Sequence, residues 1–221
     1  ASPRPARRAI SAGSSGGEGM ADDIDFYFSF GSPPGYFAST RIDALAAAHG
    51  RGVRWRPVDL REVFAEEGLK PTVAYPRKGA YHVRDWARTA RLHGIPFAGR
   101  PEVAVSPSHA VAVVFYWLAD TLGAGAARGF GRDAFHAFFV EHRGVGEPAV
   151  LAELVSRVGG DGAAVPGVLE APARARRLDD ESRAAAARGV FGSPLVIVDD
   201  EPFWGFDRFD QLERWLATGG W

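Results

Sequence analysis

The sequence predicts an α/β fold in which two β-containing ends enclose a large helical block. The chain begins with a predicted strand, helix and strand at 24–30, 33–49 and 53–59. It ends with two predicted strands and a helix, at 195–198, 202–204 and 208–217. The roughly 125 residues between these ends have the 3.6-residue periodicity of helices. The order is therefore βαβ, a helical block, then ββα.

Apolar spacing and strand alternation support the elements at both ends. The 33–49 helix carries apolar residues at helical spacing and closes at Gly50. The 53–59 strand alternates apolar residues with arginine, and we expect it to pair in parallel with the first strand. The last helix has one apolar face, made of Phe209, Leu212, Trp215 and Leu216.

The middle of the chain predicts five helices separated by glycine and proline. These helices are expected at 79–93, 108–122, 132–142, 148–158 and 174–188. The glycine-rich stretch 123–131 lies between two of them and does not follow a strand, which makes it a poor phosphate-binding loop. We expect a disordered leader at 1–21, a domain formed by 22–60 and 189–221, and a helical insertion at 61–188.

Composition narrows the function classes. The 221 residues carry a formal net charge of −1, so no global basic field favours nucleic acid, and a small neutral or anionic partner fits better. No stretch has the roughly 18 apolar residues that a membrane helix needs, and no secretory signal is visible. The chain has no cysteine, which excludes disulfides and dithiol redox chemistry and is compatible with a reducing cytoplasm.

Ser32 is the first candidate for chemistry. It follows the first strand and precedes Pro33, so it is placed to cap a helix with proline at the first helical position. This role is purely structural in many proteins. A helix start also stabilises a nearby anion by about 0.3 to 2 kcal/mol, enough to lower a thiol pKa by about one unit. Because the chain has no cysteine, such a thiolate would have to arrive on a small molecule.

Pro194 is the second candidate. It stands after Gly192 and Ser193 and directly ahead of an apolar strand, a context compatible with a cis peptide bond. Ser32 comes just after the first strand, and Pro194 comes just before the strand that resumes the sheet after the helical block.

Four blocks in order resemble the 2-hydroxychromene-2-carboxylate isomerases, a DsbA-like branch of the thioredoxin fold related to the kappa-class glutathione transferases. The blocks comprise Asp25 to Phe28 with Ser32, Pro33 and Tyr36; Lys78, Gly79, Tyr81, Asp85 and Arg88 with Gly94 to Pro96; Gly189 to Gly192 before Pro194; and Phe203 to Gly205 with Asp207 and Arg208. The resemblance covers about residues 22 to 217. It implies a thioredoxin-like fold with a helical insertion.

The resemblance also implies glutathione as cofactor and a cis–trans isomerisation in aromatic degradation. In the family a serine in the place of Ser32 holds the glutathione sulfur, and that sulfur adds to the conjugated substrate reversibly. By the same comparison, Ser193 and Pro194 would meet the cysteinyl backbone, Asp207 the γ-glutamyl ammonium, and Lys78 the glutathione or substrate carboxylate. Tyr81 and His109 are candidates for the substrate side. His109 also fits an ordinary surface or core residue.

This chain departs from the family pattern near the expected site. Pro34 and Gly35 follow Ser32-Pro33 where an aromatic residue and a serine are common, and Phe206 precedes Asp207 where a small or amide residue is usual. Ser106, Pro107, His109 and Val113 stand where the family has a proline with Asn or Asp and then an arginine. These departures affect the expected clamp for the substrate carboxylate.

Two other functions remain open: a kappa-like transferase or peroxidase, and a non-catalytic DsbA-fold protein that binds extended peptides beside Pro194. The six histidines have no spacing typical of zinc, so we expect no metal. A homodimer is compatible with the surplus of aromatic residues.

Overall fold

The computed structural model describes residues 23–61, 64, 70, 74–101 and 107–221. Its sheet has four strands in the order β2-β1-β3-β4. The strands are β1 (Ile24–Phe28), β2 (Val53–Pro57), β3 (Leu195–Val198) and β4 (Glu201–Trp204). β1 pairs in parallel with β2, and the two other pairings are antiparallel. The predicted α/β class and the βαβ and ββα ends are therefore confirmed.

The helix predicted at 33–49 is two helices, α1 (Pro33–Ser39) and α2 (Ile42–Ala48). At the break, the hydroxyls of Ser39 and Thr40 donate to the carbonyl oxygens of Tyr36 and Phe37, each at 2.7 Å. Serine and threonine hydroxyls that bond back to the preceding turn bend or end a helix. This local competition explains the break that apolar spacing did not predict.

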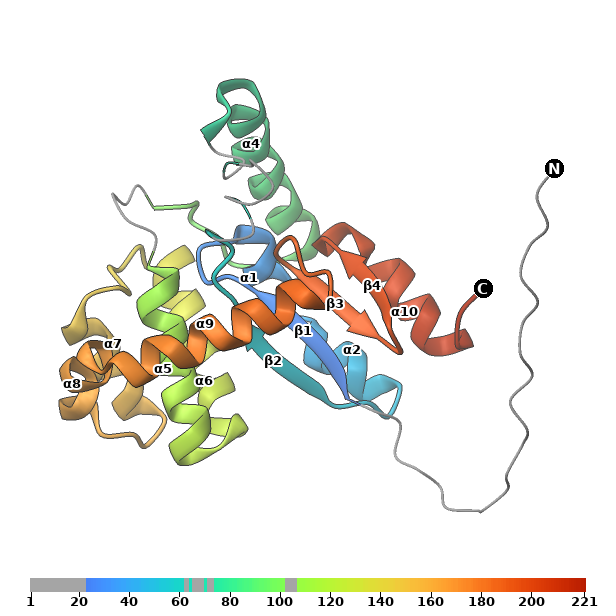
Figure 1. Ribbon diagram of the computed structural model, residues 1–221. Coiled ribbons are helices and arrows are strands. Elements are labelled where there is room, and N and C mark those ends of the chain that lie inside the picture. Colours follow the sequence, from blue (N-terminus) through green and yellow to red (C-terminus); the bar gives the residue numbers. More distant parts are fainter. Residues whose placement is uncertain (1–22, 62–63, 65–69, 71–73, 102–106) are drawn as a thin grey trace, which may run out of the picture.

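The helical block contains six α-helices among its described residues, and Figure 1 shows α5 to α8 gathered beside the sheet, with α4 projecting away from it. They are α4 (Pro76–His93), α5 (Ser108–Leu122), α6 (Ala124–Phe139), α7 (Pro148–Arg157), α8 (Val165–Glu170) and α9 (Pro172–Ala187). A short 3-10 turn, η2 (Gly162–Ala164), precedes α8. None of these described helices is long and apolar enough to cross a membrane.

The start of α6 differs from the prediction, because the glycine-rich stretch 123–131 is almost wholly helical. An added Cβ at Gly131 would stand 3.4 Å from the rings of Phe115 and Trp55. Gly131 therefore brings α6 close to α5 and to β2. Packing stabilises this helix against the low helix propensity of glycine.

Alternate residues of β1 face two different hydrophobic clusters. Phe26 and Phe28 join a large core with α1, α2, α5, α6 and the C-terminal helix α10 (Phe209–Thr218). Tyr27 joins a smaller cluster with β3 and with Ala185 of α9. The large core is shared by the sheet and the helical block, so the predicted division at 61 and 188 does not coincide with separate cores. The division into domains itself stays a prediction, and the predicted leader lies outside the described residues.

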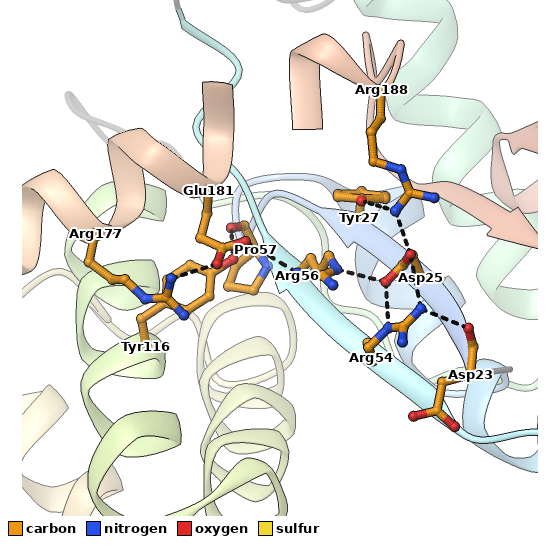
Figure 2. A network of polar contacts seen from close by, with 10 residues as sticks. All are labelled: Asp23, Asp25, Tyr27, Arg54, Arg56, Pro57, Tyr116, Arg177, Glu181 and Arg188. Atoms are coloured by element: carbon orange, nitrogen blue, oxygen red, sulfur yellow. Dashed lines mark hydrogen bonds and ion pairs between the residues drawn. The ribbon is translucent and has the colours of Figure 1, made fainter. Parts of the chain in front are cut away.

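A buried carboxylate fastens the returning helix α9 to the sheet (Figure 2). Asp25 is 3% exposed, and its oxygens accept hydrogen bonds from Arg54 Nε at 2.8 Å, Arg56 Nε at 2.7 Å and Arg188 Nη1 at 2.5 Å. Arg56 also reaches Glu181 of α9 at 3.3 Å. Burial alone would raise the pKa of Asp25, but the arginines outweigh burial and lower it to about 2. Asp25 is therefore a carboxylate throughout the neutral range.

Candidate active site

The segments that follow β1 and β2 meet at one edge of the sheet. The two strands run in parallel with Phe28 opposite Pro57, so their carboxyl ends lie side by side. Val58 N–H donates to the Phe28 carbonyl at 2.8 Å just beyond the last pair. In open α/β sheets, ligands bind beyond the carboxyl ends of parallel strands. The candidate site is built at this edge.

Ser32 caps α1, as its position before Pro33 predicts. Its Oγ accepts a hydrogen bond from Gly35 N–H at 3.1 Å, and Pro33 is the first helical residue. The same hydroxyl donates to the carbonyl oxygen of Ser193, also at 3.1 Å. Ser32 is half-buried. One hydroxyl thus joins the start of the first helix to the loop before β3.

The Ser193-Pro194 peptide bond is cis. Ser193 Oγ accepts a hydrogen bond from Ser29 N–H at 2.9 Å, and the Pro194 carbonyl accepts from Gly205 N–H at 2.9 Å. The loop is therefore held on one side by the end of β1 and on the other by the segment after β4. Ser32, Ser193 and Pro194 are brought together, as expected from the sequence.

Gly35 lies between these two serines. A Cβ added to it would stand 2.9 Å from Ser193 Oγ and 3.3 Å from Ser32 Oγ. A contact below 3.0 Å forces a neighbour to move, so the first turn of α1 approaches the Ser193 loop as closely as glycine allows. This departure from the family pattern therefore shapes the site.

Two further serines belong to the site and were not singled out from the sequence. Ser29 Oγ donates to Ser108 Oγ at 3.1 Å, which joins the end of β1 to the start of α5. We call Ser29, Ser32, Ser108 and Ser193 the serine cluster. Ser29 interrupts the apolar run between Phe28 and Phe30, which is the signal that could have found it. Ser108 stands after Pro107 at a helix start, a signal of the same kind as Ser32 before Pro33.

His109 follows Ser108 and contacts two charged side chains from the end of β2. Its Nδ1 lies 3.3 Å from Asp59 Oδ2 and 3.2 Å from Arg61 Nη2. Arg61 Nε also donates to both oxygens of Asp59, at 2.9 and 2.8 Å. Burial would raise the pKa of Asp59, but the hydrogen bonds from His109 and Arg61 hold it well below its ordinary value. Asp59 was not predicted, because its contact with His109 joins residues 50 positions apart in the sequence.

Lys78 and Tyr81 lie on the first turns of α4, which projects away from the sheet (Figure 1). Lys78 is exposed, with its Nζ 5.4 Å from the ring centre of Tyr75. Tyr81 is 57% exposed and its hydroxyl contacts Asp85 and Arg88, at 3.5 and 3.3 Å. These described contacts stay within α4 and the residue before it. The structure does not join Lys78 or Tyr81 to the serine cluster through them.

Asp207 lies in a short turn, η3 (Phe206–Arg208), between β4 and α10. Its carboxylate is exposed and accepts a hydrogen bond from Arg208 Nη1 at 2.9 Å. Gly205, two residues earlier, is the residue bonded to the Pro194 carbonyl, so Asp207 is close in sequence to the cis-proline loop. Phe206 is buried against Phe37 and Phe209, with ring centres 5.8 and 5.1 Å apart. Its apolar ring packs in the core, at the position where the family pattern expects a small or amide residue.

Of the other departures, Val113 is buried in α5, at 3% exposure, and Ser106 lies outside the described residues. A separate hollow of about 410 Å³ is lined by β4 together with Arg208, Gln211, Trp215 and Trp221. No member of the serine cluster lines this hollow. Within the described ranges, no group of three or more His, Asp or Glu side chains is arranged to hold a metal ion.

The fold and this site define a class of protein. Residues 23–217 match the family model of the DSBA-like thioredoxin domain, and the chain belongs to that family. Within it, the chain is 31% identical over 192 residues to 2-hydroxychromene-2-carboxylate isomerase of Pseudomonas putida, covering 86% of this chain and 92% of the relative. It is 31% identical over 204 residues to the enzyme of the same name from Sphingobium xenophagum, covering 89% and 99%.

A solved structure agrees with the sequence comparisons. A 2-hydroxychromene-2-carboxylate isomerase structure superposes with a TM-score of 0.76 at 32% identity, covering 89% of this chain and 94% of the other. The resemblance inferred from the four sequence blocks is confirmed: the chain belongs to the 2-hydroxychromene-2-carboxylate isomerase family. These relatives support an isomerase function for this chain.

Proposed function

We propose that this chain is a glutathione-dependent cis–trans isomerase that acts on a 2-hydroxychromene-2-carboxylate or a similar conjugated aromatic-degradation intermediate. The observation that carries the proposal is the hydrogen bond from Ser32 Oγ, at the start of α1, to the carbonyl of Ser193, the residue before the cis proline. This contact places the Ser32 hydroxyl beside the Ser193 peptide group. The hydroxyl can donate a hydrogen bond to the sulfur of a cysteine-containing peptide, and the peptide group can pair with that peptide's backbone.

The residues present fit glutathione. No Cβ at Gly35 stands between Ser32 and Ser193, and the Ser32 hydroxyl is hydrogen-bonded directly to the Ser193 carbonyl. Ser32 has a single hydroxyl proton. When the hydroxyl donates its hydrogen bond to a sulfur instead of to the Ser193 carbonyl, that carbonyl becomes available to accept a hydrogen bond from the cysteinyl N–H. Asp207, with its exposed carboxylate, is assigned to the γ-glutamyl ammonium.

Bound glutathione supplies a nucleophilic thiolate that adds reversibly to a conjugated double bond and so permits rotation. The chain's own residues bind this thiolate and stabilise its charge. Ser32 stabilises the sulfur as an anion, and the positive end of α1 adds a modest contribution, because this helix has only seven residues. Lys78, Tyr81 and His109 remain proposals for the substrate side. The cytoplasmic location and the homodimer expected from the sequence also remain predictions.

The test is glutathione binding to the wild type, Ser32→Ala and Ser32→Thr by titration calorimetry, with isomerisation measured on the same samples. Losing a hydrogen bond to a charged sulfur costs about 1.5 to 3 kcal/mol, so we expect Ser32→Ala to weaken binding of the thiolate form by about 10- to 100-fold. Ser32→Thr keeps the hydroxyl and the cap and should bind within a few-fold of the wild type.

Three results would separate the alternatives. No binding of glutathione to the wild type at millimolar concentration would contradict the proposal. Binding with stable thioether products and no isomerisation would point to a transferase. Binding of extended peptides without a glutathione effect would favour the peptide-binding function.

A further inference from the structure

His109 occupies a position at the candidate site that the proposed function leaves without a chemical role. It stands one residue after Ser108, which is bonded to Ser29 of the serine cluster. Asp59 reaches it from the end of β2, at the same edge of the sheet as the segment that leads to Ser32. The His109 side chain is 40% exposed, so a small molecule can reach its ring. The imidazole and the serine cluster therefore flank the same sheet edge.

The surroundings of His109 Nδ1 contain both a donor and an acceptor. Arg61 Nη2 can donate to Nδ1 when that nitrogen carries no proton, and Asp59 Oδ2 can accept from it when it does. Nδ1 therefore has a partner in either tautomer and in the imidazolium. Among the described residues, the charged groups that contact the ring are Asp59 and Arg61, and the N-terminal end of α5 lies beside it. The ring can gain or lose a proton at Nε2 and keep a hydrogen bond at Nδ1.

The positions of Asp59 and Arg61 are themselves fixed. Arg61 Nε binds both carboxylate oxygens of Asp59, and Asp59 N–H donates to Ser182 Oγ of α9 at 2.9 Å. Asp59 Oδ1 also accepts from Arg61 N–H at 3.1 Å. A histidine oriented by a carboxylate that is itself held is the usual arrangement of a general acid–base group.

The substrate named for the relatives presents a proton transfer that this arrangement suits. A 2-hydroxychromene carries a hydroxyl and the ring oxygen on the same carbon, so it is a cyclic hemiketal. Opening the ring breaks the bond from that carbon to the ring oxygen and forms a carbonyl from the hydroxyl. The hydroxyl proton leaves, and the ring oxygen, now a phenol, takes one up. The step is balanced without an oxidant, a reductant or the thiol.

We propose that His109 is the catalytic proton-transfer group that opens the hemiketal ring, with Asp59 and Arg61 as positioning residues. This inference rests on the proposed function for its substrate class. Nε2 takes the proton from the hydroxyl and returns it to the ring oxygen on the same carbon. Asp59 holds Nδ1–H during this transfer, which leaves Nε2 as the basic nitrogen.

The experiment measures two rates in wild type, His109→Gln and Asp59→Asn across pH 5.5 to 8.5. The first is ring opening of the hemiketal with glutathione left out, and the second is complete isomerisation with glutathione present. Glutamine keeps a hydrogen-bonding side chain but transfers no proton, so we expect ring opening to fall about 100-fold or more in His109→Gln. The part of the ring-opening pH profile that depends on His109 should be absent in His109→Gln. In Asp59→Asn it should be shifted along the pH axis. KM and glutathione affinity should stay within about two-fold.

The matched control is His136→Gln. His136 also pairs with a carboxylate, Glu141 at 3.3 Å, but it lies on α6 and belongs to no part of the candidate site. Its rates and pH profile should equal those of the wild type. Arg61→Gln, which leaves Asp59 in place, replaces Asp59→Asn if the latter does not fold, and it should likewise shift the part of the pH profile that depends on His109.

The outcomes separate this inference from the proposed function. Isomerisation by the wild type with an unchanged ring-opening rate and pH profile in His109→Gln would overturn the role of His109 and leave the proposed function standing. A rise in KM alone would show a binding contact and would also overturn it. No action of the wild type on the hydroxychromene with glutathione present would remove the proposed function and this inference together.

Discussion

At the level of single residues, Gly35 decides how closely the two halves of the site approach. The cis-proline loop comes from the far end of the chain, and it meets α1 where an ordinary side chain would not fit. The polar contacts at this point, Ser32 to Ser193 and Ser29 to Ser193, are single hydrogen bonds near 3 Å. A displacement of a few tenths of an ångström weakens such bonds markedly.

We therefore predict that Gly35→Ala weakens glutathione binding by about 10-fold and lowers stability by about 1 to 2 kcal/mol, because its Cβ crowds Ser193 Oγ. Calorimetry and urea unfolding measure the two effects. Gly125→Ala is the control, since it lies in α6 with open space around its Cβ and should be neutral or up to about 1 kcal/mol stabilising. Equal affinities for wild type and Gly35→Ala would show that the close approach does not matter for the thiol.

The sequence predicted the helix cap at Ser32 and the cis bond at Pro194, because each has a local signature: a serine before proline at a helix start, and a proline ahead of a buried strand. Their roles toward glutathione stay predictions. The sequence was insufficient for Ser29, Ser108 and Asp59. Their roles depend on partners from other elements, and hydrogen bonding between distant segments leaves no periodic pattern. The assignments of Lys78 and Tyr81 came from the family resemblance alone and stay predictions.

At the level of elements, α5 is buried on nearly all sides. Val111, Val113, Val114, Phe115 and Leu118 are each at most 3% exposed, and the helix packs between α6, α8 and α9. A helix that is apolar all round belongs to a core. Its start, which carries Ser108 and His109, is therefore held rigidly.

This burial predicts that restoring the arginine of the family pattern at Val113 would fail. Val113→Arg would bury an unpaired charge, and we expect a loss of roughly 4 kcal/mol or more. Leu122→Arg, at an exposed position of the same helix, should change stability by less than about 0.5 kcal/mol. Urea unfolding of the two variants measures the difference, and similar midpoints for both would show that the interior around Val113 accommodates a cation.

Helix positions were predicted well where apolar spacing was regular, as in α5, whose bounds agree with the expected 108–122. They were predicted poorly where one contact decides the outcome. Ser39 and Thr40 divide the first helical segment by bonding to their own backbone, and Gly131 extends α6 by packing under two aromatic rings. Both effects depend on single atoms, which a periodicity average does not detect.

At the level of the whole molecule, Asp25 ties the sheet to α9 and makes stability depend on pH. The pKa of Asp25 is lowered to about 2 from an ordinary value of 3.8, so the unfolded chain binds more protons than the folded one between these values. The stabilisation from this carboxylate is fully present above about pH 4. It is lost as the pH falls toward 2.

We predict that Asp25→Asn lowers stability at pH 7 by about 3 kcal/mol, the low end of the range for a broken buried ion pair, since its arginines reach solvent. The variant should also lose less stability than the wild type on acidification from pH 4 to 2. Urea midpoints at several pH values measure both effects. Asp199→Asn removes an exposed partner of Arg51 and should cost under about 1 kcal/mol. A parallel decline of wild type and Asp25→Asn in acid would contradict this role.

The position of β1 in the middle of the sheet has a consequence for the order of events during synthesis. One neighbour, β2, follows it closely in the chain, but the other, β3, arrives only after the whole helical block. The ion pair between Asp25 and Arg188 likewise spans 163 residues. A nascent chain on the ribosome therefore carries one open side of its central strand until β3 has been synthesised, and a chaperone that shields this side would raise the yield of native protein.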